Sequence, residues 1–213
     1  MSWKKEISQI KLREKLAKQQ GGSEAVKVQH DKGRLTLRER IDLLLDKDSF
    51  DEIGKVAGGA EYDDEGNLLS LTPANFILGF GKIEGQDVIV GGEDFTVKGG
   101  SPNAAGLRKS VYTEDLAVKH KFPLVRLHEG GGGSVAGPSK EKKGYGGDPV
   151  FARSRFKSVA QTLKEVPVVS AALGPVAGLP ASRFVGSHFR IMVKDNAQIL
   201  SLIHISEPTR LTS

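Results

Sequence analysis

Four consecutive glycines, Gly130 to Gly133, are the residues of this sequence best placed to do chemistry through the backbone. They lie in the segment RLHEGGGGSVAGP, directly after Leu124–Leu127, an apolar run that is typical of a buried strand. Glycine loses more conformational entropy on folding than other residues, so four in a row predict a position where the backbone must be free of side chains. The run could form a flexible tether, a phosphate cradle, or a pair of N–H groups directed at an oxyanion.

The phosphate interpretations fit the spacing poorly. A P-loop requires lysine where Pro138 stands. The pattern G-x-G-x-x-A from Gly131 to Ala136 resembles a dinucleotide fingerprint, but the next strand ends at Gly174 without an acidic residue to bind a ribose. A flexible loop would explain the run without any function. The oxyanion interpretation explains more, because glycine lets a peptide turn toward developing charge and a following helix adds a favourable dipole.

A second glycine-bearing segment, Gly174–Gly178 (GPVAG), occupies an equivalent place, after the apolar run Val166–Leu173 and before a predicted short helix. Strands and helices alternate along the chain, which favours an α/β fold with parallel strands. Ligands bind outside the carboxyl ends of such strands, so we expect the two glycine turns to form one site.

The elements that must position this site follow from local patterns. A capping box, Thr36 with Glu39, begins a helix that continues to Leu45. The other expected elements are an amphipathic helix near residues 3–16, a hairpin over 74–95 with its turn at 84–86, helices over 104–120 and 149–165, and a strand over 189–193.

Composition indicates a globular protein, with 38% hydrophobic and 27% charged residues. The absence of cysteine excludes disulfides and cysteine-bound zinc, and predicts a cytoplasmic protein. The net charge of +5 arises in the first 40 residues, which hold eleven basic and five acidic side chains. Because the remaining chain is close to neutral, we expect a basic helical arm over residues 1–33 rather than a nucleic-acid-binding domain, and no membrane span.

Four segments together resemble one family. They are Arg34–Leu45 followed by Asp48–Phe50, the stretch Glu93–Ser101 (EDFTVKGGS), the turn Gly174–Gly178, and Met192–Asp195 (MVKD). Their order is that of the carboxyltransferase (beta) subunit of biotin-dependent acyl-CoA carboxylases of the propionyl-CoA and methylcrotonyl-CoA type. The resemblance covers residues from about 30 to 199.

This resemblance implies a crotonase-like fold, a spiral of β-β-α units, of which this chain holds the N-terminal half. It implies transfer of CO2 from carboxybiotin to the α-carbon of an acyl-CoA, with an oxyanion hole formed by backbone amides. It also implies a biotin carboxylase or biotin carrier subunit as partner, and assembly into a homo-oligomer through a C-terminal domain. We expect no metal, because no carboxylate or histidine cluster has ligand spacing. The family's glycine pair falls on Gly130 and Gly131.

On this basis the predicted catalytic residues are Gly130, Gly131 and Gly132. The predicted substrate-binding residues are Glu129, Gly133, Ser134, Gly174, Pro175, Ala177 and Gly178. The sequence departs from the family pattern where Glu129 replaces serine and Gly132-Gly133 replace Ala-Arg. His128 and Glu129 form a possible acid–base pair, for which we favour a positioning role. Glu93 and Asp94 are expected to orient the glycine loop.

Two other functions stay open: a decarboxylase or hydrolase of CoA thioesters on the same fold, and a non-catalytic fragment or binding module. We expect residues 34–199 to form a truncated N-terminal carboxyltransferase domain. Residues 200–213 (LSLIHISEPTRLTS) resemble the translation of an adaptor used in DNA sequencing, and we expect them to lie outside the fold.

Overall fold

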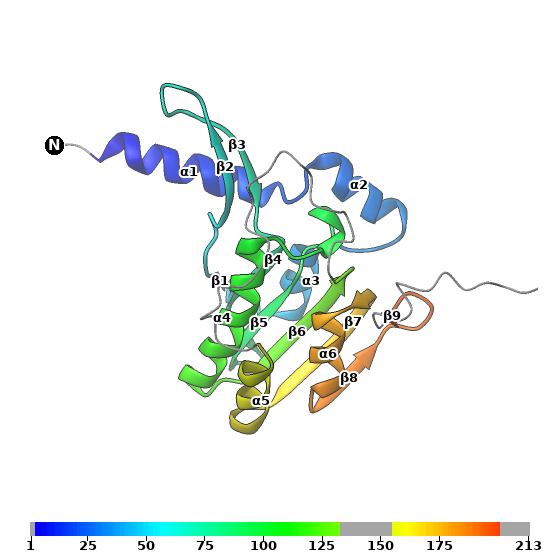
Figure 1. The fold of residues 1–213 in the computed structure, drawn as a ribbon. Helices are drawn as coiled ribbons and strands as arrows, with labels where there is room; N and C mark the ends of the chain where they lie inside the picture. Colours follow the sequence, from blue (N-terminus) through cyan, green and yellow to red (C-terminus); the bar gives the residue numbers. More distant parts are fainter. Residues whose placement is uncertain (1–2, 133–154, 201–213) are drawn as a thin grey trace, which may run out of the picture.

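A twisted seven-stranded sheet forms the centre of the molecule, and the computed structural model describes it within residues 3–132 and 155–200. The strand order is β1-β4-β5-β6-β7-β8, and β9 pairs with β7 beyond this path (Figure 1). The strands are β1 (Asp51–Glu52), β4 (Phe76–Ile83), β5 (Gln86–Glu93), β6 (Leu124–Gly130), β7 (Val168–Ala177), β8 (Phe189–Met192) and β9 (Gln198–Leu200). The pair β4–β5 is antiparallel, whereas β5, β6, β7 and β8 run parallel.

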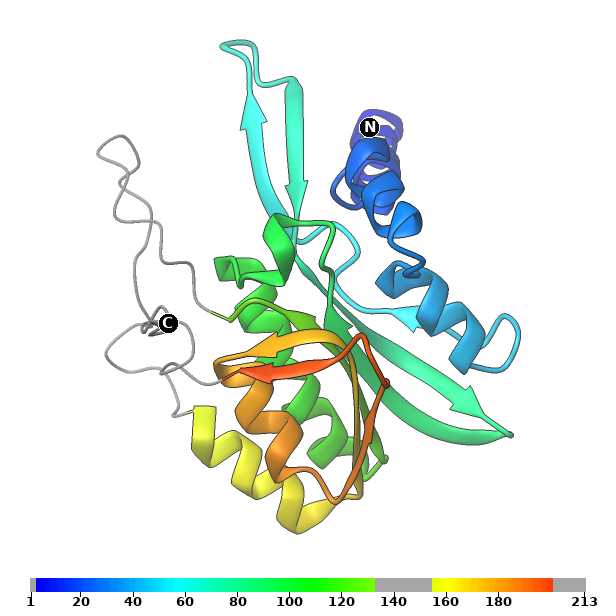
Figure 2. The same cartoon turned by 90° about the vertical axis from the view of Figure 1, so that its right-hand side faces the viewer.

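Helices cover both faces of this sheet (Figure 2). On one face lie α4 (Ala104–His120), α5 (Arg155–Glu165) and α6 (Leu179–Gly186). The opposite face is covered by α3 (Leu37–Leu44). Successive residues of β4 alternate between the two cores, as strand geometry requires: Leu78 packs toward α4, and Ile77 packs toward α3.

The N-terminal arm forms two helices, α1 (Lys4–Lys18) and α2 (Ser23–Asp31), with Gly21 and Gly22 between them. Beside α1 stands a two-stranded hairpin of β2 (Gly58–Tyr62) and β3 (Leu68–Pro73), which the sequence patterns did not predict. The apolar side chains of Trp3, Ile7 and Ile10 on α1 are at least half exposed. The arm therefore contributes little to the central core.

Several predicted elements are confirmed. The capping box is present, because Thr36 accepts from the N–H of Glu39 while the Glu39 carboxylate accepts from the N–H of Thr36. The helix predicted over residues 104–120 has those bounds, and the side chain of Asn103 caps it by accepting from Gly106 N–H at 2.7 Å. The helix predicted from residue 149 is described only from Arg155 onward.

Two predicted boundaries are wrong. The strand expected to end at Leu127 continues through Gly130, and the segment expected to turn at Gly174 stays extended to Ala177. The cause lies in tertiary pairing: β7 pairs with β8 along its first half and with β9 along its second, where Pro175 is opposite Gln198. Leu200, the first residue of the expected adaptor segment, belongs to β9, and residues 201–213 lie outside the described part.

Candidate active site

The two glycine turns contact each other. Gly132 has a φ of 73°, and a Cβ at this residue would lie 2.9 Å from the carbonyl oxygen of Ala177 and 3.2 Å from the nitrogen of Gly178. Only glycine tolerates both the positive φ and this close approach. Gly178, with a φ of 65°, is the N-cap of α6, and as a glycine it has no side chain to cap this helix. The N-terminus of α6 therefore lies against Gly132.

A pocket of about 180 Å³ opens beside this contact. Gly132 and Leu179 line it where the two turns meet, and its buried polar lining residues include Glu93, Ser110 and Arg183. The remaining lining residues are Asn75, Phe76, Gly100, Pro102, Gly106, Leu107 and Pro180. The pocket thus lies beside the backbone of the two glycine turns and has a mostly apolar lining, as is usual in a small-molecule site.

A left-handed turn holds the end of β6. Lys98, Gly99 and Gly100 have φ values of 54°, 61° and 70°, and the carbonyl of Gly99 accepts a hydrogen bond from the N–H of Gly131 at 3.0 Å. A Cβ at Gly100 would lie 2.6 Å from the backbone of Gly130, so glycine is required there for close packing. The amide of Gly131 is therefore engaged within the protein.

Glu129 points away from the pocket, toward the N-terminal helices. Its carboxylate is 1% exposed and pairs with Arg40, with Arg34 Nη1 at 3.4 Å and with Gln29 Nε2 at 3.4 Å. A Cβ at Gly174 would lie 2.5 Å from Oε1 of Glu129. Through these contacts Glu129 links α2 and α3 to the end of β6.

His128 points to the other face of the sheet and links two elements of the site. Its Nδ1 lies 3.1 Å from Oε2 of Glu93, and its Nε2 lies 3.4 Å from Oγ of Ser170. Ser170 Oγ is 2.6 Å from Ser187 Oγ, which donates to the carbonyl of Arg183 at 2.8 Å. All of these side chains are buried.

The hydrogen-bond directions in this chain of contacts can be assigned. A hydroxyl has one hydrogen to donate, and Ser187 gives its hydrogen to a carbonyl, so Ser170 must donate to Ser187. Nδ1 of His128 donates to the Glu93 carboxylate, and Nε2 lies 3.4 Å from a Ser170 oxygen whose hydrogen is already given to Ser187. His128 thus links Glu93 on β5 to Ser170 on β7.

The charge on Glu93 is stabilised by its neighbours. Burial alone would raise the pKa of this carboxyl, but the charges of His128, Arg183 and Arg126, together with the His128 hydrogen bond, outweigh burial and hold the pKa below 4.5, its ordinary value. For Asp94 the balance is opposite, because burial raises its pKa despite hydrogen bonds from the hydroxyl and N–H of Thr96.

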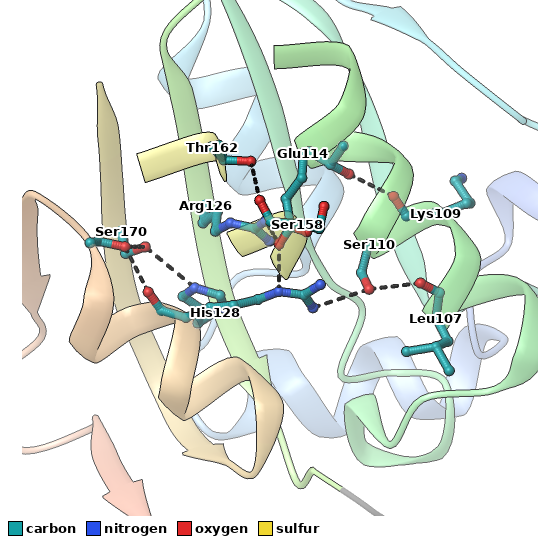
Figure 3. A network of polar contacts seen from close by, with 12 residues as sticks. Leu107, Lys109, Ser110, Glu114, Arg126, His128, Ser158, Thr162 and Ser170 are labelled. Atoms are coloured by element: carbon teal, nitrogen blue, oxygen red, sulfur yellow. Dashed lines mark hydrogen bonds and ion pairs between the residues drawn. The ribbon is translucent and has the colours of Figure 1, made fainter. Parts of the chain in front are cut away.

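A second buried ion cluster is centred on Glu114 and Arg126 (Figure 3). Oε1 of Glu114 accepts from Arg126 Nη2 at 2.5 Å and from Arg183 Nε at 2.9 Å, and Arg183 Nη1 donates to Ser110 Oγ at 3.1 Å. Arg183 Nη2 has no hydrogen-bond partner among the described residues. The cluster links α4, α6 and β6, and two of its members, Ser110 and Arg183, line the pocket.

The structure brings some of the predicted site residues together and separates others. Gly132 and Gly178 meet, Gly130 ends β6, and Gly174, Pro175 and Ala177 lie within β7. Gly133 and Ser134 lie outside the described residues. Sequence reasoning missed Leu179, Arg183 and the α4 residues of the pocket, because their proximity depends on tertiary packing rather than on any local pattern.

Residues 3–132 and 155–200 contain no cluster of three or more histidine, aspartate or glutamate side chains arranged to hold a metal ion. Within the same residues, no helix has the length and apolarity that crossing a bilayer requires.

Comparison with known proteins identifies relatives over most of the chain. Residues 28–202 match the model of the carboxyl transferase domain family. The chain is 33% identical over 193 residues to the propionyl-CoA carboxylase beta chain of Roseobacter denitrificans, covering 90% of this chain and 36% of that protein. It is also 31% identical over 190 residues to the methylmalonyl-CoA decarboxylase subunit alpha of Veillonella parvula, covering 88% of this chain and 36% of the relative. The chain therefore spans about a third of the length of these curated relatives.

Solved structures give the same fold. The transcarboxylase 12S hexamer core, solved with methylmalonyl-coenzyme A bound, superposes with a TM-score of 0.67 at 24% identity, over 90% of this chain and 36% of that one. A single-chain, multi-domain long-chain acyl-CoA carboxylase superposes with a TM-score of 0.71 at 25% identity, over 88% of this chain and 19% of that one. The predicted crotonase-like fold, present as a partial N-terminal half, is confirmed.

Proposed function

The chain belongs to the carboxyl transferase domain family, and on that premise we propose that it forms the acyl-CoA-binding half of a biotin-dependent acyl-CoA carboxylase. The observation that carries the proposal is the contact between Gly132 and the uncapped N-terminus of α6 at the edge of the pocket. The thioester carbonyl would lie between the N–H groups of Gly132 and Leu179, with the acyl chain in the pocket.

This placement suits the charge that carboxylation creates. Removal of the α-proton puts negative charge on the thioester oxygen, and two fixed N–H donors plus the α6 dipole stabilise it without reorganisation. We assign the role to Gly132 and Leu179 rather than to Gly131, since the N–H of Gly131 already donates to Gly99. Gly130 and Gly131 would then hold the loop in place.

We assign no residue of this chain to biotin. When bound, carboxybiotin on a partner subunit or domain would supply the CO2 that forms the new bond at the α-carbon. The residues of this chain bind the thioester, orient its α-carbon and stabilise the oxyanion. The partner and the assembly into an oligomer remain proposals from the family.

A binding experiment tests the first half of this proposal. We expect propionyl-CoA to bind the chain more tightly than CoA without an acyl group, when both are measured by calorimetry. Gly132→Ala should remove that preference, because the new Cβ would lie against Ala177. Gly66→Ala is the matched control, since Gly66 also has a positive φ, of 80°, but no atom within 4 Å of the added Cβ. Equal binding of CoA and propionyl-CoA would contradict the proposal.

The second candidate function is decarboxylation of a malonyl-type thioester, which the decarboxylase relative supports. Loss of CO2 leaves the same enolate oxygen in the same place. Product analysis on methylmalonyl-CoA separates the two functions: propionyl-CoA formed in the presence of avidin indicates decarboxylation that needs no biotin, whereas avidin blocks transfer through biotin. Release of free CoA with methylmalonate would indicate a hydrolase.

A further inference from the structure

Asn75 is a buried asparagine that directly precedes β4 and lines the pocket beside the glycine turns. Burying a polar side chain is unfavourable unless the protein replaces the hydrogen bonds that water would make, so the partners of Asn75 indicate what this residue holds. Those partners belong to residues 94–103, the connection between β5 and α4, which we call the β5–α4 loop.

Asn75 contacts the β5–α4 loop at its start and at its end. At the start, the backbone carbonyl of Asn75 accepts from the N–H of Asp94 at 3.0 Å. At the end, its side-chain Nδ2 donates to the carbonyl of Ser101, and its Oδ1 accepts from the N–H of Asn103 at 3.1 Å. A side-chain amide donates and accepts at once, whereas an ionised carboxylate only accepts. Asn75 therefore ties both ends of the loop to the start of β4.

Gly106, in the first turn of α4, leaves the space that the Asn75 amide occupies. A Cβ at residue 106 would lie 2.1 Å from Oδ1 of Asn75, which is closer than non-bonded atoms approach. The first turn of α4 therefore packs directly on the Asn75 side chain, and any larger residue at position 106 would displace that side chain.

Between its two tied ends, the β5–α4 loop contains the left-handed turn Lys98–Gly100. Consecutive residues with positive φ are costly, above all the one that is not glycine, and they persist where surrounding contacts impose them. This turn in its place fixes the glycine run, because the carbonyl of Gly99 accepts from the N–H of Gly131. A continuous series of contacts thus leads from Asn75 to the residue that precedes Gly132.

We propose that Asn75 is a positioning residue for the oxyanion site: it holds the β5–α4 loop so that the N–H of Gly132 is directed at the thioester oxygen. This inference rests on the proposed function, because it needs the thioester to lie at Gly132 and Leu179. Donors stabilise an oxyanion best when they are fixed before the charge develops. A displaced loop would therefore cost the acyl group a hydrogen bond and leave the rest of CoA bound.

Asn75→Ala tests the inference through the preference for propionyl-CoA over CoA, measured by calorimetry. The preference should fall roughly 3-fold to 10-fold, the effect of one hydrogen bond to a neutral carbonyl, while the affinity for CoA itself stays the same. Hydrogen exchange followed by NMR should show the N–H of Gly131 exchanging faster, because its bond to Gly99 is loosened. Asn67→Ala is the control and should change neither result, since Asn67 is an exposed asparagine that donates to Asp63 at 2.9 Å.

Gly106→Ala displaces the Asn75 amide without removing it. The added Cβ meets the end of a side chain, which can move, so this variant should fold even if Asn75→Ala does not. It should lower the preference and speed exchange at Gly131 in the same way. Gly186→Ala is the matched control, because Gly186 is also helical but its added Cβ meets only Leu163, at 3.6 Å. A Cβ that merely narrowed the pocket would not reach Gly131, so unchanged exchange at Gly131 in Gly106→Ala would overturn the inference.

The binding results separate the inference from the proposed function. If the unmodified chain prefers propionyl-CoA but both variants keep that preference, or bind propionyl-CoA and CoA equally more weakly, the inference is wrong and the proposed function stands. If the unmodified chain has no preference for propionyl-CoA, the proposed function fails and the inference fails with it.

Discussion

Gly174 leaves the space that the Glu129 carboxylate occupies: a Cβ at residue 174 would lie 2.5 Å from Oε1 of Glu129 and 2.7 Å from its Cγ. The two residues belong to neighbouring parallel strands, and the carboxylate is fixed by Arg40 and Arg34. The absent side chain in β7 therefore permits the ion pairs that fasten the N-terminal helices to the sheet.

Gly174→Ala should destabilise the protein by about 1–3 kcal/mol, the usual cost of forcing extra atoms into a packed interior. Urea unfolding followed by circular dichroism measures this change. Gly59→Ala is the control, because Gly59 also lies in a strand but an added Cβ meets nothing within 4 Å. Similar midpoints for the two variants would show that Glu129 moves aside without cost.

The stability contributed by Glu93 should depend on pH in a defined direction. Its pKa is lower in the folded protein than its ordinary value of 4.5, so the folded state binds the proton less readily than the unfolded state does. The contribution is complete above the unfolded pKa and is lost as the pH falls through the folded value.

Unfolding free energies of the wild type and of Glu93→Gln should therefore differ by about 1–3 kcal/mol at pH 7, the range for hydrogen bonds to charged groups. The difference should shrink as the pH is lowered below about 4.5. Glu61→Gln, which changes an exposed carboxylate on β2, is the control. A difference that stays constant from pH 7 to pH 3 would mean that Glu93 is not ionised in the folded state.

The Nδ1 of His128 should carry a hydrogen in the folded protein, because it lies 3.1 Å from the carboxylate of Glu93, whose pKa is lowered. Nitrogen-15 NMR should show an N–H at Nδ1, and Glu93→Gln should shift its signal because the charged acceptor is removed. Ser182→Ala, on an exposed site of α6, should leave the signal unchanged. A ring without hydrogen at Nδ1 in the unmodified protein would refute the assigned direction.

The helices α3 and α4 could be predicted because the residues that start them are neighbours in the sequence. Asn103 followed by apolar periodicity marks the start of α4, and Thr36 with Glu39 marks α3. The ends of β6 and β7 could not be predicted, because glycine and proline usually break strands. Pairing of the end of β7 with β9 and with Gly130 of β6 keeps it extended, and no local pattern indicates that pairing.

In the candidate site, too, the local features could be predicted and the tertiary contacts could not. The two glycine turns could be recognised in the sequence and their contact inferred from the parallel sheet. The buried polar lining of the pocket could not be predicted, because Glu93, Ser110 and Arg183 come from three elements and no spacing relates them. The direction of Glu129 depends on strand register, which places it on the face opposite His128.

Lys109 on α4 should make the stability of the protein depend on pH in the alkaline range. Burial lowers the pKa of its ammonium group to about 8, while Glu52 opposes this shift and Arg38 adds to it. The ordinary value is 10.5, so the unfolded chain binds the proton more tightly than the folded protein, and stability should rise through this group as the pH increases from about 8 to 10.5.

Replacing Lys109 removes this dependence. Lys109→Met should be more stable than the wild type at pH 7, and the advantage should shrink by roughly 3 kcal/mol, or about 1.4 kcal/mol for each unit of the pKa difference, as the pH reaches 10.5. Glu52 keeps its partner in this variant, because Arg38 donates to it at 2.8 Å and 3.2 Å. Lys119→Met, an exposed residue of the same helix, is the control for general alkaline effects. Guanidinium unfolding at pH 7, 8.5 and 10 measures the series. Parallel curves for the wild type and Lys109→Met would show that Lys109 stays fully charged, held by Glu52 and the carbonyl of Gly54.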